Sequence, residues 1–407
     1  MAKSSFTLEQ ITYGLLVLLV FVLPLNVVAG SCVFVATAVV GLANVLLYGK
    51  PKPITLPPKV KYPLIALFIL SGISVVMSGD RGASLYNWVW VVGQEAGIFL
   101  LMLYYGSKGH RPQFLMKTFL VAAALVAVYG ILQYCYGIGV SDTAWTDASA
   151  FPELKRRAAS TLVNPNILGT FLVTAIAYCV GIFAPLRGGK TRIGLIIIFV
   201  LCCACEMFTF SRGNWVALFW VLLTFAAFFY HRALLPLISG CLVVLYLCWN
   251  LLSHRILSIF ATEDTSVALR WSYLESTLAM IKEHPLGVGW YGYRFAWPEY
   301  DFYLQNPDVI MYHCHNLYLN ITAELSIIGL GLFLYLLWQF FKLAQHVRRN
   351  ARLRWVRGIA CGYLASLVGI LISGLTDYTL FNIQLGMFFW LGNAMILTLY
   401  ARYEEAE

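Results

Sequence analysis

The chain has 407 residues, of which 60% are hydrophobic and only 12% charged, and its mean hydropathy is +0.76. A soluble domain of this length carries roughly twice that charged fraction, so the composition excludes an ordinary soluble protein. The apolar runs lack the alternation over about ten residues that is typical of membrane β-barrels, so the spans are predicted to be helical.

Taken in chain order, the apolar runs predict about twelve membrane-spanning helices of around 20 residues each. These runs lie near residues 11–29, 32–48, 63–78, 87–105, 113–136, 162–184, 193–210, 214–230, 233–251, 316–341, 359–380 and 382–400. Several are short or adjacent, so ten to twelve spans fit the pattern. The expected fold is an all-α polytopic membrane protein with a large loop between the ninth and tenth helices.

This pattern divides the chain into three parts. Residues 1–252 hold the first nine spans, and residues 253–314 form the large loop, in which an amphipathic helix is expected that contains Arg270 and runs to about Ile281. Residues 315–407 hold the last three spans and a short tail. No internal repeat or linker segment divides the chain further.

Lysine and arginine predict the orientation of these spans. Most of the 28 basic residues lie at the termini or in the connections that follow even-numbered spans, including a cluster over residues 348–357. Basic connections stay on the cytoplasmic side, so both termini are expected there and the large loop on the outer face. The net charge of +9 is thereby explained by topology, and no nucleic-acid partner is expected.

Nine basic residues are expected on the outer side, where topology does not require them, and three arginines stand out among them. Arg157 precedes the sixth span, Arg212 lies in the turn between the seventh and eighth spans, and Arg270 lies in the large loop. One guanidinium group can bind two phosphate oxygens at once, and it stays protonated. A single arginine at a helix end is usually an interfacial anchor, but three around one loop predict a site for an anion, and suit a polyphosphate better than a sugar.

His315 opens the tenth span, in a loop rich in aromatic residues. A histidine at the lip of a helix can accept a proton near neutral pH, which makes His315 a candidate general base. The alternative is a structural histidine that ties the loop to a backbone carbonyl. Asp377, near the outer end of the eleventh span, could orient the histidine or an arginine, or simply pair with an arginine.

A metal or nucleotide site is not expected. His313 and His315 could be two metal ligands, but no carboxylate or cysteine stands at a spacing that completes the set, and Asp-x-Asp does not occur. Residues 287–292 match G-x-G-x-x-G without the strand and helix that a dinucleotide site requires, so they are read as a glycine-rich turn. We therefore predict no metal and no cofactor.

Together these residues resemble the O-antigen ligase and polymerase superfamily of bacterial inner membranes. The resemblance covers most of the chain in its spans, its cytoplasmic termini and its late external loop. The local matches are Arg157 to Asn166, Thr209 to Gly213, Leu269 to Trp271, Pro285-x-Gly287-x-Gly289, and His315-Asn316 through Ala323-Glu324 to Gly329. One departure is Ser326, which stands where the family pattern has a glycine; we expect a serine to be small enough for the same close packing.

The resemblance implies a GT-C-like glycosyltransferase that works on the periplasmic face. It implies a metal-independent, inverting transfer from an undecaprenyl-diphosphate-linked glycan to a lipid A–core acceptor. Carried over residue by residue, His315 resembles the base, Arg212 and Arg270 the grip on the diphosphate, and Arg157 a third member of that grip. Asp377 resembles the acidic residue near the end of the family's chain.

Two alternatives remain open. A polymerase of the same superfamily would extend one lipid-linked glycan with another, and the sequence separates it poorly from a ligase. A solute or bicarbonate transporter would be expected to show internal repeats and charged residues at the membrane midplane. The chain also has no long C-terminal extension of the kind expected of protein O-glycosylating relatives, which argues against that branch.

Overall fold

A computed structural model describes residues 7–49, 54–139, 156–186, 188–233, 265–303 and 310–404, together with a few single residues between 235 and 246. Within these ranges every long regular element is an α-helix, and no strand occurs. The helices are α1 (Leu8–Val22), α2 (Val27–Tyr48), α3 (Pro58–Ser74), α4 (Arg81–Leu101), α5 (Arg111–Tyr136), α6 (Pro165–Phe183), α7 (Lys190–Thr209), α8 (Arg212–Phe228), α11 (Thr265–Glu283), α12 (Tyr293–Tyr300), α13 (Leu317–Asn350), α14 (Arg354–Ser373) and α15 (Ile383–Glu404).

The helical membrane class predicted from the apolar runs is confirmed. Among the described residues, nine helices are long and apolar enough to cross a membrane, and α1 and α8 are shorter apolar helices. These eleven correspond to eleven of the twelve predicted spans. The predicted ninth span, 233–251, lies largely outside the described residues, so the total of about twelve stays a prediction.

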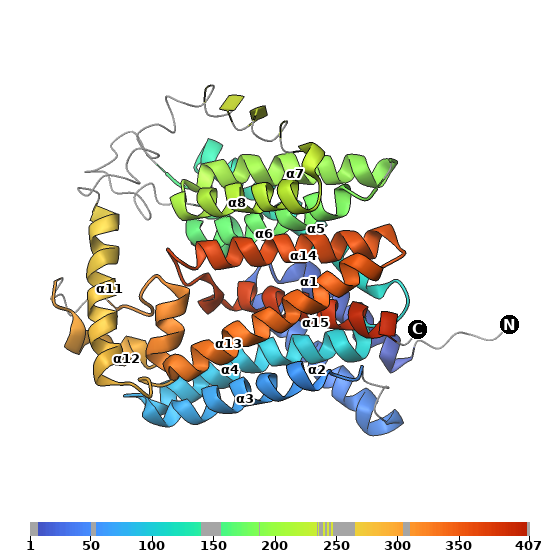
Figure 1. Cartoon of the computed structure of the whole chain (residues 1–407). Coiled ribbons are helices and arrows are strands. Elements are labelled where there is room, and N and C mark those ends of the chain that lie inside the picture. Colours follow the sequence, from blue (N-terminus) through green and yellow to red (C-terminus); the bar gives the residue numbers. More distant parts are fainter. Residues whose placement is uncertain are drawn as a thin grey trace.

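The spans lie side by side in one bundle, with α6 and α14 near its centre (Figure 1). These two helices approach so closely that there is no room for a Cβ atom at Gly181, Gly358 or Gly362. Gly358 and Gly362 are four residues apart on one face of α14, and they lie against Tyr178 to Ile182 of α6. Small residues at this spacing let helices pack backbone to backbone in a membrane, where helix association depends on close packing.

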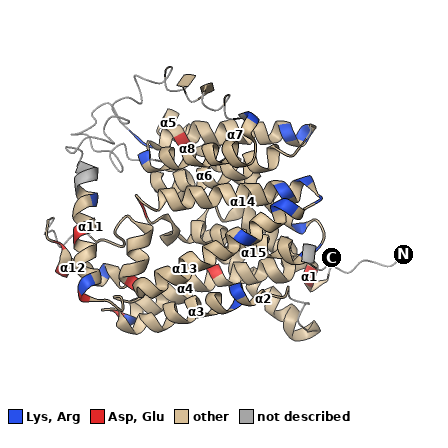
Figure 2. Cartoon of the chain, viewed as in Figure 1, with Lys and Arg blue, Asp and Glu red and all other residues tan. Residues whose placement is uncertain are grey.

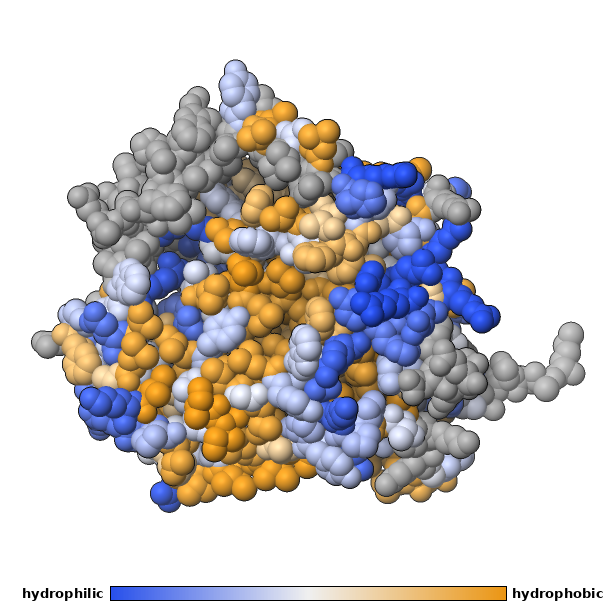
Figure 3. Space-filling view, in the orientation of Figure 1, coloured by the Kyte–Doolittle hydropathy of each residue, from blue (hydrophilic) through white to orange (hydrophobic). Residues whose placement is uncertain are grey.

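The two ends of the bundle differ in charge. Lys and Arg gather at the end where the described chain starts and finishes (Figure 2). There Glu9 of α1 pairs with Lys108 at 2.7 Å and Arg111 at 3.0 Å, and Arg402 of α15 donates a hydrogen bond to the carbonyl of Gly109. Between the ends, the face in Figure 3 shows a broad apolar band, as expected of a surface that contacts lipid.

The opposite end of the bundle carries α11 and α12, which lie across the ends of the long helices (Figure 1). The segment that joins them, Pro285–Gly292, is here called the strap. Trp290 of the strap is held by two hydrogen bonds, from its backbone N–H to Ser74 Oγ at 3.0 Å and from its indole N–H to Asn87 Oδ1 at 2.8 Å. The strap therefore fixes α11 and α12 to the ends of α3 and α4.

The strap also fits a break in α13. At Ser326 the backbone has φ 65° and ψ 175°, which interrupts the helix. The carbonyls of Ala323 and Glu324 accept hydrogen bonds from the strap, from the N–H groups of Val288 at 2.8 Å and Gly289 at 3.0 Å. The predicted glycine-rich turn is thus confirmed as irregular backbone, and it satisfies carbonyls that would otherwise lack a partner inside the protein.

The expectation for Ser326 needs a correction. We expected a serine to serve in place of the family glycine because both are small enough for close packing. The structure shows a different requirement, because the φ and ψ of Ser326 fall in a region that essentially only glycine adopts without strain. Ser326 partly compensates, since its hydroxyl oxygen accepts a hydrogen bond from the N–H of Ile328 at 3.2 Å and caps the second half of α13.

Replacing Ser326 with glycine should therefore leave stability unchanged or raise it by about 1 kcal/mol, because the relief of strain outweighs the lost cap. Ser326→Ala is the matched control: it keeps the strain and loses the cap, so it should destabilise by about 1 kcal/mol. Thermal unfolding of the three purified proteins in the same detergent measures the order. A glycine variant less stable than the alanine variant would contradict the strain at this position.

Candidate active site

Four chain segments meet at the end of the bundle that carries α11 and α12. They are the starts of α6, α8 and α13 and the turn that follows α14. Asn164 caps α6 through the N–H groups of Asn166 and Ile167, and Asn316 caps α13 through those of Tyr318 and Leu319. These starts agree with the predicted helix entries. The predicted eleventh span is too long, because α14 ends at Ser373 and Asp377 lies in the turn that follows.

His315 and Asp377 form the centre of the site. His315 Nδ1 lies 3.1 Å from Asp377 Oδ1, and their side chains are 30% and 10% exposed. Because an ionised carboxylate can only accept, Nδ1–H donates and the lone pair lies on Nε2. Within the described residues Nε2 makes no hydrogen bond, so it is available to a substrate. This is the arrangement in which a carboxylate orients a histidine base.

The charge of Asp377 is held by its surroundings. Burial alone would raise the pKa of this carboxyl group, but the hydrogen bond from His315 and the positive charges of His315 and Arg270 outweigh it, so the pKa falls below its usual range. The backbone N–H of Tyr378 also donates to Oδ1 at 2.8 Å. Asp377 therefore stays ionised and can stabilise a positive charge on the His315 ring.

Two aromatic neighbours set the position of the His315 ring. Tyr273 of α11 stacks on it, with ring centroids 5.7 Å apart and an interplanar angle of 23°. The His313 ring meets it edge to face at 4.5 Å, and His313 Nδ1 accepts the backbone N–H of His315 at 3.2 Å. The His315 backbone has φ 55°, in the left-handed region that a histidine adopts only with strain.

His313 is suited to support and not to proton transfer. Burial and the nearby charge of His315 lower its pKa to about 4, although Asp377 acts in the opposite direction. It is therefore neutral at pH 7, with Nδ1 serving as an acceptor. The two histidines that the sequence places together thus have different environments.

Asn166 joins the separate segments into one network, and sequence reasoning did not single it out. Its Nδ2 donates to Asp377 Oδ2 at 2.8 Å, while its Oδ1 accepts from Arg157 at 3.0 Å and from Ser211 Oγ at 3.0 Å. Asn214 adds a hydrogen bond to the backbone carbonyl of Asn166 at 2.8 Å. The repeated asparagine in Asn164-Pro165-Asn166 was the available signal, but an asparagine at a helix start usually indicates a cap alone.

Arg157, which is half-buried, contributes to this network through two hydrogen bonds. Besides its contact with Asn166, its Nε–H donates to the carbonyl of Thr209 at 2.7 Å, which ties the segment before α6 to the end of α7. Two of its N–H groups are thus used to hold the site together. This geometry favours a positioning role for Arg157 over the predicted role as a third arginine that binds the diphosphate.

Arg212 and Arg270 approach the pair from two other directions. Arg212 is the first residue of α8, and the next residue, Gly213, lies against Thr376 with no room for a Cβ atom, so the start of α8 touches the turn that holds Asp377. Arg270 lies one turn before Tyr273 on α11, and its charge lowers the pKa of Asp377. The predicted arginines therefore lie on segments that adjoin the His–Asp pair.

One expectation about metal ligands is wrong. We expected no carboxylate to complete a site with His313 and His315, but one nitrogen from each and a carboxylate oxygen of Asp377 lie within 4.8 Å of one another. The three groups could in principle hold a cation. In this geometry, however, they satisfy one another: Asp377 accepts from His315, and His313 Nδ1 accepts from the His315 backbone. A metal would have to displace these hydrogen bonds.

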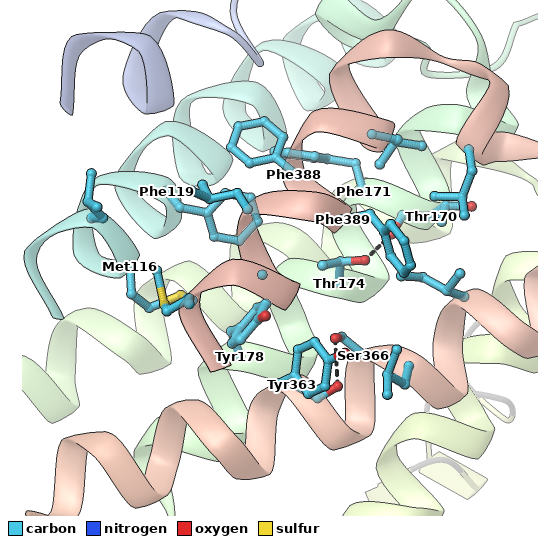
Figure 4. A pocket seen from close by; sticks show the side chains of 18 residues that line it. Met116, Phe119, Thr170, Phe171, Thr174, Tyr178, Tyr363, Ser366, Phe388 and Phe389 are labelled. Carbon is cyan, nitrogen blue, oxygen red and sulfur yellow. Dashed lines mark hydrogen bonds between the residues drawn. The ribbon is translucent and has the colours of Figure 1, made fainter. Parts of the chain in front are cut away.

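A cavity lies below the site, among α5, α6, α14 and α15 (Figure 4). Its lining is mainly phenylalanine and leucine, with hydroxyl groups from Thr170, Tyr178 and Ser366. Thr170 also donates to Asn214 Oδ1 at 3.0 Å and so joins the cavity to the network around Asn166. The space is suited to an apolar group.

The fold and the site define a multi-pass helical membrane protein with a histidine that a carboxylate orients at one end of its bundle. Residues 196–334 match the family model described as O-antigen ligase, a segment that includes Arg212, Arg270 and His315. This match supports the resemblance to the O-antigen ligase and polymerase superfamily. The match implies a glycosyltransferase-like ligase or polymerase that acts on lipid-linked glycans. No curated protein matches the chain.

The low pKa of His313 predicts a specific acid sensitivity. Its pKa is lower in the folded protein than the ordinary 6.5, so the unfolded chain binds the proton more readily. The stability linked to His313 is complete above about pH 6.5 and is lost as the pH falls toward 4. The melting temperature of the wild type should therefore fall more steeply across this window than that of His313→Asn, which keeps an acceptor and does not titrate. Parallel curves for the two proteins would contradict the buried, neutral state of His313.

Proposed function

We propose that this protein is an O-antigen ligase-like glycosyltransferase that moves a glycan from undecaprenyl diphosphate to a lipid A–core acceptor. The observation that carries the proposal is the His315–Asp377 pair, with Nε2 of His315 open to a substrate and arginines around it. The family match supports the class of reaction, and the position of the pair at the end of a membrane bundle suits substrates whose lipid tails stay in the bilayer.

In the proposed reaction His315 Nε2 takes the proton from an acceptor hydroxyl group. The oxygen then attacks the anomeric carbon of the donor sugar from the side opposite the diphosphate, and the bond from that carbon to the diphosphate oxygen breaks, which inverts the configuration. Asp377 stabilises the imidazolium, which afterwards gives its proton to water or to the released diphosphate.

The leaving diphosphate gains negative charge as the bond breaks, and fixed positive groups must stabilise it. We propose that Arg212 and Arg270 do so. Arg212 opens α8, whose N-cap residue Ser211 uses its hydroxyl for Asn166 and makes no side-chain cap. The first N–H groups of that helix thus add to the positive potential at the same place. With these cations in the site, we propose that the reaction needs no metal.

The charge difference between the two ends supports an orientation. The end with Glu9, Lys108 and Arg402 is proposed to be cytoplasmic and the end with His315 periplasmic, in a bacterial inner membrane. A cysteine introduced at Asn350 should then resist an impermeant maleimide added from outside, whereas labelling from outside would reverse the orientation.

A polymerase of the same superfamily is the second candidate, because it would use the same base and the same grip. The two differ in the acceptor, which is lipid A–core for a ligase and a second lipid-linked glycan for a polymerase. Purified protein supplied with one donor and each acceptor in turn separates them. The family match favours both over a transporter.

We expect His315→Ala to reduce transfer by roughly 10²- to 10⁴-fold, the usual contribution of a general base. His313→Asn should retain most of the activity, because His313 is neutral and supports its neighbour. A chelator should not change the rate of the wild type. The measurement is joined product formed in a reconstituted assay at equal amounts of folded protein. Near-normal turnover by His315→Ala would remove the proposed base, and inhibition by chelator would favour a metal on His313, His315 and Asp377.

Arginine and lysine variants test the diphosphate grip. Arg212→Ala and Arg270→Ala should each lower donor-dependent turnover by roughly thirty- to a thousand-fold, as expected for the loss of about 2–4 kcal/mol of charge stabilisation. Lysine should rescue only in part, because it supplies charge without the paired N–H groups. Full activity of both lysine variants would identify the two residues as membrane anchors.

A further inference from the structure

A row of aromatic side chains extends from the catalytic histidine along the outer end of the protein. The row consists of Tyr291, Tyr312 and Phe381: the Tyr291 and Tyr312 ring centroids lie 6.2 Å apart, and those of Tyr312 and Phe381 5.9 Å apart. Phe381 then lies 5.2 Å from the ring of His313, which in turn lies 4.5 Å from His315. The aromatic row therefore leads directly to the proposed base.

Arg294 of α12 lies on this row. Its guanidinium group is 5.0 Å from the centroid of Tyr312, and one N–H donates to the hydroxyl of Tyr291 at 3.0 Å. Within the described part of the chain it forms no salt bridge; Asp80 acts on it only through its charge. The row thus carries a positive group that no described residue neutralises through a close ion pair.

The row is accessible and, at one position, strained. Tyr312 is 37% exposed, and Tyr291 and Phe381 are half-buried. Tyr291 has φ 58°, although glycines occupy the other left-handed positions of the strap, Gly287 and Gly289. A glycine at position 291 would remove the strain and also the ring. Because Tyr291 is kept despite this backbone strain, we infer that its side chain has a function.

We propose that the aromatic row is a subsite for a sugar ring of the acceptor, and that Arg294 binds an anionic group on that sugar, a carboxylate or a phosphate. A sugar has an apolar C–H face that packs on aromatic rings and a rim of hydroxyl groups that suits tyrosine hydroxyls and guanidinium N–H groups. The charge of Arg294 selects an acidic sugar over a neutral one. This proposal rests on the proposed transferase function and adds the acceptor class to it.

The geometry favours the acceptor over the donor as the occupant. The donor diphosphate is assigned to Arg212 and Arg270, and Arg270 lies one turn from Tyr273, which covers one face of His315. The aromatic row leaves His315 through a different neighbour, His313. The two substrates would thus approach the base from different sides, as a transfer between two large glycans requires.

Steady-state rates of the full chain in lipid nanodiscs test this subsite. Tyr312→Ala and Arg294→Gln should raise the KM for an acidic acceptor oligosaccharide by roughly three- to thirtyfold and leave the KM for the donor unchanged. Tyr86→Ala is the matched control, since Tyr86 is 71% exposed on α4 and lies outside the site. With an acceptor from which carboxylates and phosphates have been removed, Arg294→Gln should no longer differ from wild type.

A binding measurement separates failure of the subsite from failure of the function. Saturation-transfer NMR with the free acceptor oligosaccharide should give a signal for wild type that weakens in Tyr312→Ala. If Tyr312→Ala also lowers the melting temperature, the same signal is compared between wild type and Arg294→Gln instead. Normal transfer with unchanged acceptor KM and unchanged signal in both variants would overturn the subsite. If the wild-type protein transfers no glycan, the proposed function is overturned. The difference in NMR signal between wild type and the variants then tests saccharide binding alone.

Discussion

The site depends on one carboxylate that is shared between two partners. Asp377 uses one oxygen for His315 and the other for Asn166, and Asn166 in turn holds Arg157 and Ser211. Through these few hydrogen bonds the starts of α6, α8 and α13 are fixed to the turn after α14. Inside a protein such charge-assisted hydrogen bonds are strong, and a missing partner would leave a buried charge without compensation.

Backbone strain gathers in the same place. Within the described residues, the non-glycine residues with positive φ are Ser160, Val163, Phe210, Tyr291, His315 and Ser326. Each lies in a segment that forms the site or holds the strap, and none lies in the rest of the bundle. The close packing of α6 against α14 offers a stable base against which this strain can be held. A site shaped in advance needs little rearrangement when charge develops during a reaction.

The helices and the chemical types of the site residues could be predicted from the sequence, and the contact of Asp377 with His315 was one of the alternatives predicted for that carboxylate. Most other contacts of the site could not be predicted. Long apolar runs and the asparagines before α6 and α13 mark those helices because membrane spans and caps have local patterns. The break at Ser326 is hidden, since the apolar run continues through it. Asn166 and Asp377 are 211 residues apart, and a neutral amide gives no sign of such a distant partner. Asp377 was predicted as a site residue, but its closeness to His313 was not, because the two residues are far apart in the sequence.

The break in α13 also restricts how substrates can enter. The strap supplies N–H groups to two carbonyls of α13, and in a lipid environment those carbonyls would find no water to replace them. Lifting the strap would leave both carbonyls without a hydrogen-bond partner. A lipid-linked substrate is therefore expected to reach His315 along a path that leaves the strap in place.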